Sequence, residues 1–338
     1  MPDGASSAAA AWFATKVIAL LAPGQGAQKP GMLAPWLDLP SVAERAAALA
    51  DAAALDLISL GTTAGADEIK DTAITQPLVV ATALLVADAL DDSVGLPAGA
   101  PTAGHSVGEF AAAALAGIFD QATAVRLAAR RGRAMAACCA ATPTSMAAVL
   151  GGDKDAVLAA LAERGLVGAN VNGGGQIVAA GPLDAILSLK DDAPADATRV
   201  IPLSVAGAFH TQYMAGAEDE LAQAVGGVIP ADPTRPLITN ADGHVVATGA
   251  GYLSLLVKQL TRPVRWDLCM AQLAALGVTG VIEFTPAGTL TGLVKRELPA
   301  VATLAIKTPD DIDKARDFIQ EHGAADPSPI DSTNEAQS

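Results

Sequence analysis

The stretch PTAGHSVGEFAAAALAG, residues 101–117, places Ser106 between two glycines and ahead of a helix-forming run. The letters GHSVG at 104–108 fit G-x-S-x-G, the strand–turn–helix elbow that lifts a serine hydroxyl clear of the backbone. Glycine is needed on both sides because a side chain would clash in so tight a turn. The start of the following helix points amide donors at a developing oxyanion. The stretch therefore predicts a nucleophilic Ser106.

A serine at neutral pH needs a general base, and the chain offers four histidines. His105 adjoins the serine, and neighbouring side chains in such an elbow diverge. His244 lies in the turn signal NADGHVV, and His322 sits near a polar tail. His210, in AGAFHTQYM, is the remaining candidate. No Asp between Ser106 and His210 stands out as a third catalytic group, so a main-chain carbonyl is expected to orient the imidazole.

The chain on either side of the elbow alternates apolar strands with helices. An apolar run at 17–21 has the composition of a buried strand, and helices are expected at about 41–59 and 78–90. Between about 145 and 203 the order becomes β-α-β-β-α-β, the ferredoxin-like unit. We therefore expect an α/β fold: an α/β-hydrolase-like core with a parallel sheet, plus an inserted ferredoxin-like α+β small domain.

These patterns, with the composition of the chain ends, divide the sequence into segments. The N-terminal residues are rich in Ala and Ser, and the last residues are polar and contain proline. We expect a flexible extension at 1–15, a large catalytic domain at 16–143 and 205–310, a small domain at 144–204, and a disordered tail at 324–338.

Composition excludes several classes of protein. The formal charge of −15 over 338 residues argues against nucleic-acid binding, which needs a basic face. No uninterrupted apolar stretch is long enough to predict a membrane-spanning helix. The three cysteines, Cys138, Cys139 and Cys269, form no disulfide framework, which favours a reducing cytoplasm. No Cys/His cluster has metal-ligand spacing, so no metal is expected.

Several short motifs in the sequence are similar to those of a known enzyme family. APGQGAQ, TQP, GHSVGE, RRGRAM, GANVN, GAFH, PVRW and GTLTGLVKREL occur in the order found in malonyl-CoA:acyl-carrier-protein transacylases of type II fatty-acid synthesis and in the related acyltransferase domains of polyketide synthases. The chain resembles that family from about Val17 to Leu298. Two segments depart from the family pattern: some members have Gln at Arg265, and the usual Gly-Pro-Gly after the last strand reads TPAG here.

The resemblance implies a role for each matching residue. Ser106 would carry the malonyl group as an ester, with His210 as general base and then acid. The main-chain N–H groups of Gln25 and Val107 would form the oxyanion hole, and Gln25 would also line the substrate site. Arg131 would pair with the malonyl carboxylate.

Two further positions bear on substrate choice and on the base. Phe209, which precedes the histidine, would fill the space that a methylmalonyl group needs, and so favours malonyl. The segment around Arg265 would orient the histidine through its main chain.

The resemblance implies ping-pong transfer from malonyl-CoA to the phosphopantetheine thiol of acyl carrier protein, without a cofactor of the enzyme's own. Nucleic-acid and membrane partners are not expected, and we expect a monomer. Three alternatives stay open: a serine hydrolase or thioesterase with the same elbow, a transferase for another extender such as methylmalonyl-CoA, and a non-catalytic carrier-protein scaffold.

Overall fold

The apolar run near the start of the chain forms β1 (Val17–Ala22), the central strand of a five-stranded sheet. In the computed structural model, residues 16–194 and 196–323 are described. The expected extension at 1–15 and tail at 324–338 lie outside them. The sheet has the order β10-β9-β1-β2-β7, and all its neighbouring strands are parallel. Its other strands are β2 (Thr102–Gly104), β7 (Leu237–Ile238), β9 (Val278–Glu283) and β10 (Ala302–Ala305).

Side chains of β1 alternate between the two faces of the sheet, as strand geometry requires. Ile18 and Leu20 belong to the larger apolar core, whereas Ala19 and Leu21 belong to a second core. Both faces are covered, which explains the continuous apolar run of a parallel strand. The larger core contains α3 (Thr72–Val94), α4 (Gly108–Leu115) and α5 (Gln121–Ala141), and the second contains α10 (Trp266–Ala275) and α11 (Thr289–Glu297).

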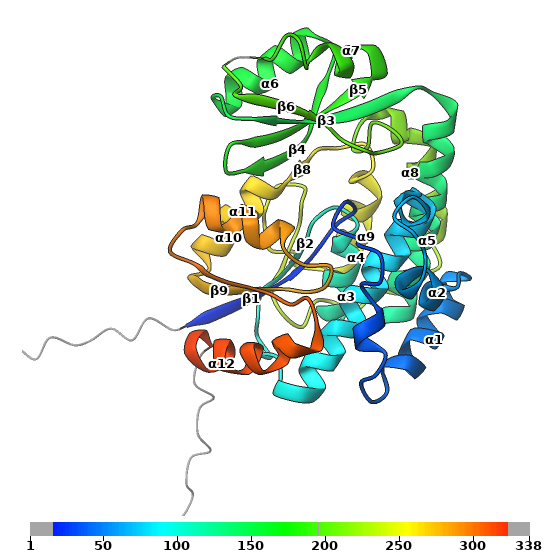
Figure 1. The fold of residues 1–338 in the computed structure, drawn as a ribbon, viewed down its shortest axis with the longest axis vertical. Helices are drawn as coiled ribbons and strands as arrows, with labels where there is room; N and C mark the ends of the chain where they lie inside the picture. The colour runs from blue at the N-terminus through cyan, green and yellow to red at the C-terminus, as the bar shows by residue number, and fades with distance from the viewer. Residues whose placement is uncertain (1–15, 195, 324–338) are drawn as a thin grey trace, which may run out of the picture.

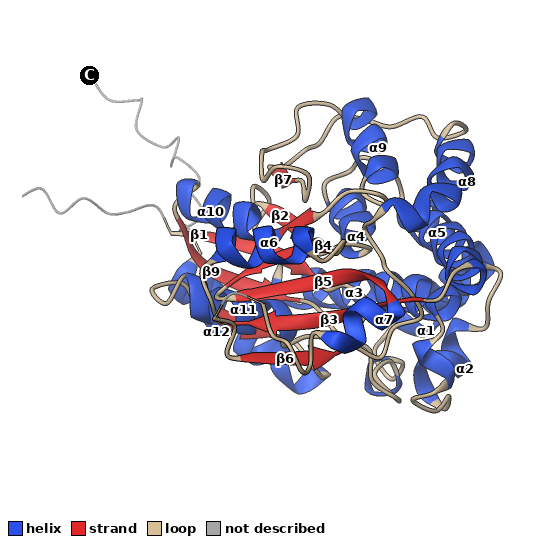
Figure 2. Cartoon of the chain, turned by 90° about the horizontal axis from the view of Figure 1, so that it is seen from above, coloured by secondary structure: helices blue, strands red, loops and turns tan. Residues whose placement is uncertain are grey.

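The remaining helices complete the layers seen in Figures 1 and 2. They are α1 (Val42–Ala53), α2 (Leu57–Thr62), α6 (Lys154–Glu163), α7 (Leu183–Ser188), α8 (Ala215–Val225), α9 (Gly249–Lys258) and α12 (Ile312–His322).

Two helix expectations need correction. The helix expected at 41–59 is broken, because Ala54 adopts left-handed backbone angles and ends α1 before α2 begins. The helix expected from Leu78 starts earlier, at Thr72, and contains Pro77. The side chain of Asp71 caps its first turn by accepting from the Ala73 N–H at 2.8 Å.

The second sheet forms the upper layer in Figure 1. The chain order β3-α6-β4-β5-α7-β6 and the antiparallel strand order β6-β3-β5-β4 agree with the expected ferredoxin-like unit. Its strands are β3 (Thr144–Leu150), β4 (Val167–Gly173), β5 (Gln176–Pro182) and β6 (Arg199–Pro202). The expected α/β fold with a parallel sheet and a smaller second sheet is confirmed.

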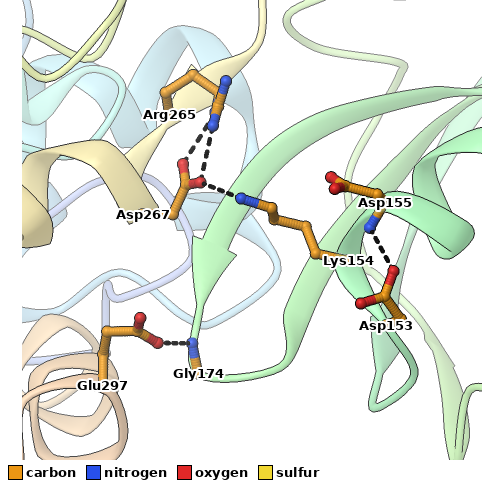
Figure 3. A network of polar contacts seen from close by, with 7 residues as sticks. All are labelled: Asp153, Lys154, Asp155, Gly174, Arg265, Asp267 and Glu297. Carbon is orange, nitrogen blue, oxygen red and sulfur yellow. Dashed lines mark hydrogen bonds and ion pairs between the residues drawn. The ribbon is translucent and has the colours of Figure 1, made fainter.

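The two sheets are joined by a strand and by polar contacts. β8 (Val264–Arg265) pairs in parallel with β4, so the second sheet contains a strand from beyond the expected 144–204 segment. Asp267, next to β8, accepts from Arg265 at 2.8 Å and lies 3.5 Å from Lys154 of α6 (Figure 3). Glu297 of α11 accepts from the Gly174 N–H in the β4–β5 turn (Figure 3). These contacts fix the position of the second sheet over the carboxyl end of the first.

Among the helices of the described part of the chain, α3 alone is long and apolar enough to cross a membrane. Of its most apolar stretch, 83% is buried inside the protein, so α3 is the central helix of the larger core.

Candidate active site

Ser106 occupies the turn between β2 and α4, with φ at +52°, a conformation that few non-glycine residues adopt. The flanking glycines are required by close backbone contacts. A Cβ at Gly104 would fall on the Gly108 backbone, and a Cβ at Gly108 would lie 2.6 Å from the Pro23 carbonyl oxygen. The sequence thus folds locally into the elbow that its G-x-S-x-G pattern predicts.

His210 lies beside the serine, as a general base requires. Its Nε2 is 2.7 Å from Ser106 Oγ, and its Nδ1 donates to the main-chain carbonyl of Gln259 at 2.8 Å. That second bond leaves Nε2 as the unprotonated nitrogen facing the hydroxyl. Burial, and then the nearby charge of Arg131, lower the pKa of His210 to about 3. The imidazole is therefore neutral at physiological pH and able to accept the serine proton.

Arg131 reaches the same point from α5. Its Nη2 donates to Ser106 Oγ at 3.3 Å and to Gln259 Oε1 at 2.8 Å, while its Nη1 donates to Gln76 Oε1 at 2.7 Å. The side chain is 1% exposed, and Nε has no partner among the described residues. Burial lowers the pKa of Arg131 to about 9, although the charge of Glu109 opposes this. At neutral pH the site therefore holds a buried cation bound by neutral amides.

The glycine after this arginine explains how it reaches the site. A Cβ at Gly132 would lie 2.6 Å from the Thr72 carbonyl oxygen, so only glycine lets α5 approach the start of α3 so closely. This contact brings Arg131 beside Gln76, which the first turns of α3 carry.

The main-chain N–H groups of Val107 and Gln25 have no acceptor within the part of the chain that the structure describes. Val107 directly follows the serine, and Gln25 follows β1 in the PGQG loop. This loop lies against the elbow: a Cβ at Gly24 would be 2.6 Å from the His105 carbonyl oxygen. Two free donors on segments held this closely are suited to an anionic oxygen.

Phe209 and Arg265 are placed differently from each other. Phe209 is buried directly before the histidine. Arg265 makes no hydrogen bond with His210, and its guanidinium instead pairs with Asp267 at the junction of the two sheets. The expected histidine-orienting segment therefore needs correction, because the carbonyl that receives Nδ1 belongs to Gln259, at the end of α9. A main-chain acceptor leaves no side-chain signature, so the sequence could not locate it.

The other three histidines lie where they cannot act as the base of Ser106. His105 points away from the serine and bonds Asn172 at 2.9 Å, while His244 is exposed beside Asp242, and His322 ends α12 against Phe318. The elimination of these residues as the base agrees with their positions.

Sequence reasoning missed four side chains that support the site: Gln76, Glu109, Asn240 and Gln259. Asn240 accepts from the Ser106 N–H and donates to the Gly104 carbonyl, both at 2.8 Å. Glu109 carried a signal, because it is the one formal charge in the apolar run after the serine. The other three are neutral amides far apart in sequence, and no spacing rule joins them.

Comparisons with known proteins agree with this arrangement. The family model described as acyl transferase domain matches residues 20–326. A malonyl CoA-acyl carrier protein transacylase of Mycobacterium bovis is 54% identical over 300 residues, which cover 88% of this chain and 99% of the relative.

Two solved structures are similar over nearly their whole length. The crystal structure of MCAT from Mycobacterium tuberculosis superposes with a TM-score of 0.85 at 53% identity, covering 89% of this chain and 99% of that one. A malonyl-transacylase in complex with a type II polyketide synthase acyl-carrier protein gives a TM-score of 0.83 at 30% identity, with coverage of 89% and 99%. The chain therefore belongs to the malonyl CoA-acyl carrier protein transacylase family of acyl transferase domains.

Proposed function

We propose that this protein transfers the malonyl group of malonyl-CoA to the phosphopantetheine thiol of acyl carrier protein through a malonyl-Ser106 ester. One observation carries the proposal: a buried guanidinium, Arg131, lies 3.3 Å from the hydroxyl of a serine that is itself 2.7 Å from a neutral histidine. A serine–histidine pair alone serves many acyl transfers and hydrolyses, whereas the added buried cation selects an acyl group with a terminal acid.

In the first half-reaction, Ser106 Oγ attacks the thioester carbonyl carbon while His210 Nε2 takes the hydroxyl proton. The carbonyl oxygen becomes an oxyanion, which the N–H groups of Val107 and Gln25 stabilise. The C–S bond then breaks, the CoA sulfur takes the proton from His210, and the malonyl ester remains on Ser106. The Gln259 carbonyl keeps Nδ1–H in place throughout.

The second half-reaction runs these steps in reverse with a new thiol. His210 takes the proton of the phosphopantetheine thiol, the sulfur attacks the ester carbonyl, and Ser106 Oγ leaves with the proton returned by His210. No metal or cofactor of the enzyme is needed for either half.

Two side chains set the choice of acyl group. Arg131 is a buried cation whose acceptors among the described residues are neutral side chains, so its charge can bind the malonyl carboxylate. Phe209 is buried next to His210, where its bulk disfavours the branched methylmalonyl group.

The carrier is the partner that family membership supports, and a structural relative was solved with an acyl-carrier protein. We propose that the product serves fatty-acid synthesis, that the enzyme acts as a monomer, and that it works in a reducing cytoplasm, because its cysteines, Cys138, Cys139 and Cys269, are all free.

Intact-mass analysis after incubation with malonyl-CoA tests the proposed function. We expect one malonyl group on the wild-type protein and none on Ser106→Ala, while the matched variant Ser188→Ala, at an exposed serine of α7, keeps the adduct. Adding holo carrier protein should remove the group and malonylate the carrier. Release of free malonate instead would indicate a hydrolase, and no adduct on the wild type would refute the proposal.

A further inference from the structure

Glu109 is a buried carboxyl group that the acyl-transfer steps do not use. It lies in the first turn of α4, three residues after the nucleophile, and is 1% exposed. Burying a carboxylate costs free energy unless hydrogen bonds compensate it, so the groups that bind Glu109 indicate its role.

The two oxygens of Glu109 accept from two different segments. Oε1 accepts from the main-chain N–H of Asn240 at 2.7 Å, and Oε2 accepts from the side-chain Nε2 of Gln259. Gln259 Nε2 also donates to the Ser106 carbonyl oxygen at 3.1 Å. Glu109 therefore joins the elbow, the segment after β7 and the end of α9 at one buried point.

The Gln259 side chain in turn connects Glu109 to the cation of the site. Its NH₂ group faces the carboxylate of Glu109, and its Oε1 accepts from Arg131 Nη2 at 2.8 Å. A carboxylate only accepts and a guanidinium only donates, so the amide satisfies both neighbours in this orientation alone. The hydrogen bond from Arg131 to Gln259 therefore depends on the Glu109 carboxylate on the other side of the amide.

We propose that Glu109 is a positioning residue for substrate selection: its carboxylate holds the Gln259 amide with the oxygen toward Arg131, and so fixes the guanidinium that receives the malonyl carboxylate. The proposal rests on the proposed function, because it assumes that Arg131 binds the acid group of the substrate. Glu109 acts through Gln259 and has no contact with the reacting atoms.

The charges agree with this role. Among the described residues, no salt bridge reaches Arg131, and the negative charge of Glu109 is the influence that raises the pKa of Arg131 against the effect of burial. Burial raises the pKa of Glu109 itself to about 7, while hydrogen bonds from Asn240, Tyr252, Gln259 and Thr239 favour its charged form.

Glu109→Gln is the informative variant because it keeps the shape of the side chain. It leaves one acceptor oxygen for two donors, the Asn240 N–H and the NH₂ group of Gln259. The Asn240 N–H is fixed by the main chain, so the oxygen of the new side chain stays with it, and the new NH₂ group faces the NH₂ group of Gln259. Arg131 then loses a charge-assisted acceptor, whereas the His210 contact, made by the main-chain carbonyl of Gln259, is retained.

Two reactions of this variant distinguish a loss of Arg131 positioning from a general loss of active-site structure. We expect the KM for malonyl-CoA to rise by about tenfold or more, the effect of one charge-assisted hydrogen bond. Inactivation by phenylmethylsulfonyl fluoride, a neutral reagent that reacts with Ser106 and has no acid group for Arg131 to bind, should stay within about threefold of wild type. Glu163→Gln, at an exposed glutamate of α6, is the matched control and should change neither.

A double-mutant cycle, measured by thermal unfolding, tests the contact between Glu109 and Gln259. Gln259→Glu should lower the melting temperature because it sets two carboxylates face to face, and adding Glu109→Gln should restore much of the loss. If Glu109→Gln fails to fold, recovery in the double variant supports the proposal and failure of both variants overturns it.

The role of Glu109 would be refuted if Glu109→Gln left the KM for malonyl-CoA unchanged or slowed both reactions equally. It would also be refuted if the shifts in melting temperature of the two single variants simply added in the double variant. If the wild type forms the malonyl adduct, these results leave the proposed function standing. Absence of that adduct refutes the function itself.

Discussion

Replacing Arg131 with alanine should remove the preference for an acyl group that carries an acid. In the free protein this cation is 1% exposed, bound by the amides of Gln76 and Gln259, and paired with no carboxylate among the described residues. Its charge is therefore available to a substrate carboxylate, and the amides hold the guanidinium in place before the substrate arrives.

The magnitude follows from the charge of Arg131, which no carboxylate neutralises in the described part of the chain. A substrate carboxylate that meets one edge of the guanidinium can accept two charge-assisted hydrogen bonds. At about 1.5–3 kcal/mol each, their loss amounts to about 3 kcal/mol or more. Each 1.4 kcal/mol is a factor of ten, so kcat/KM for malonyl-CoA should fall by more than about 100-fold.

The assay follows transfer from malonyl-CoA and from acetyl-CoA to holo carrier protein. Arg131→Ala should lose activity with malonyl-CoA and lose far less with acetyl-CoA, which has no acid group. Arg130→Ala is the matched control, since Arg130 is the exposed neighbour on the same helix. Equal losses with both substrates would refute the reasoning, because they would place the role of Arg131 in the chemical step or in folding.

Three further outcomes are expected. Because the pKa of His210 is lowered to about 3, its neutral form persists in acid, and the rate of CoA release at saturating malonyl-CoA, which leaves out the effect of Glu109 on KM, should hold from about pH 7 down to about pH 5; a fall of this saturated rate centred near pH 6.5, where a free imidazole titrates, would contradict this. Gly132→Ala should destabilise the protein by about 1–3 kcal/mol in urea unfolding and raise the KM for malonyl-CoA, whereas Gly292→Ala, at a helical glycine with open space around it, should not; equal effects would exclude the close contact between α5 and α3 as the cause. Phe209→Ser should raise the kcat/KM ratio of methylmalonyl-CoA to malonyl-CoA by about tenfold in a competition assay, and an unchanged ratio would show that this side chain does not limit the acyl pocket.

Short patterns in the sequence predicted those turns and strands whose conformation depends on a few consecutive residues. The glycines around Ser106 predict the elbow because no other residue fits that turn, and the apolar run at 17–21 predicts a buried strand of a parallel sheet. The β-α-β-β-α-β order likewise predicts the second sheet. By contrast, the break at Ala54 and the early start of α3 depend on capping and packing, which the apolar pattern does not record.

The sequence by itself therefore determined the fold class, the elbow with its serine and, by elimination, the histidine that lies 2.7 Å from it. Only the tertiary structure showed that Gln259, and not the segment around Arg265, supplies the carbonyl for His210, and that Glu109 and Gln76 flank the network around Arg131. The physical reason is that hydrogen bonds between neutral amides, carbonyls and a buried carboxyl depend on which segments meet in space. Such contacts have no fixed spacing along the chain, whereas a tight turn or an apolar strand is encoded within a few consecutive residues.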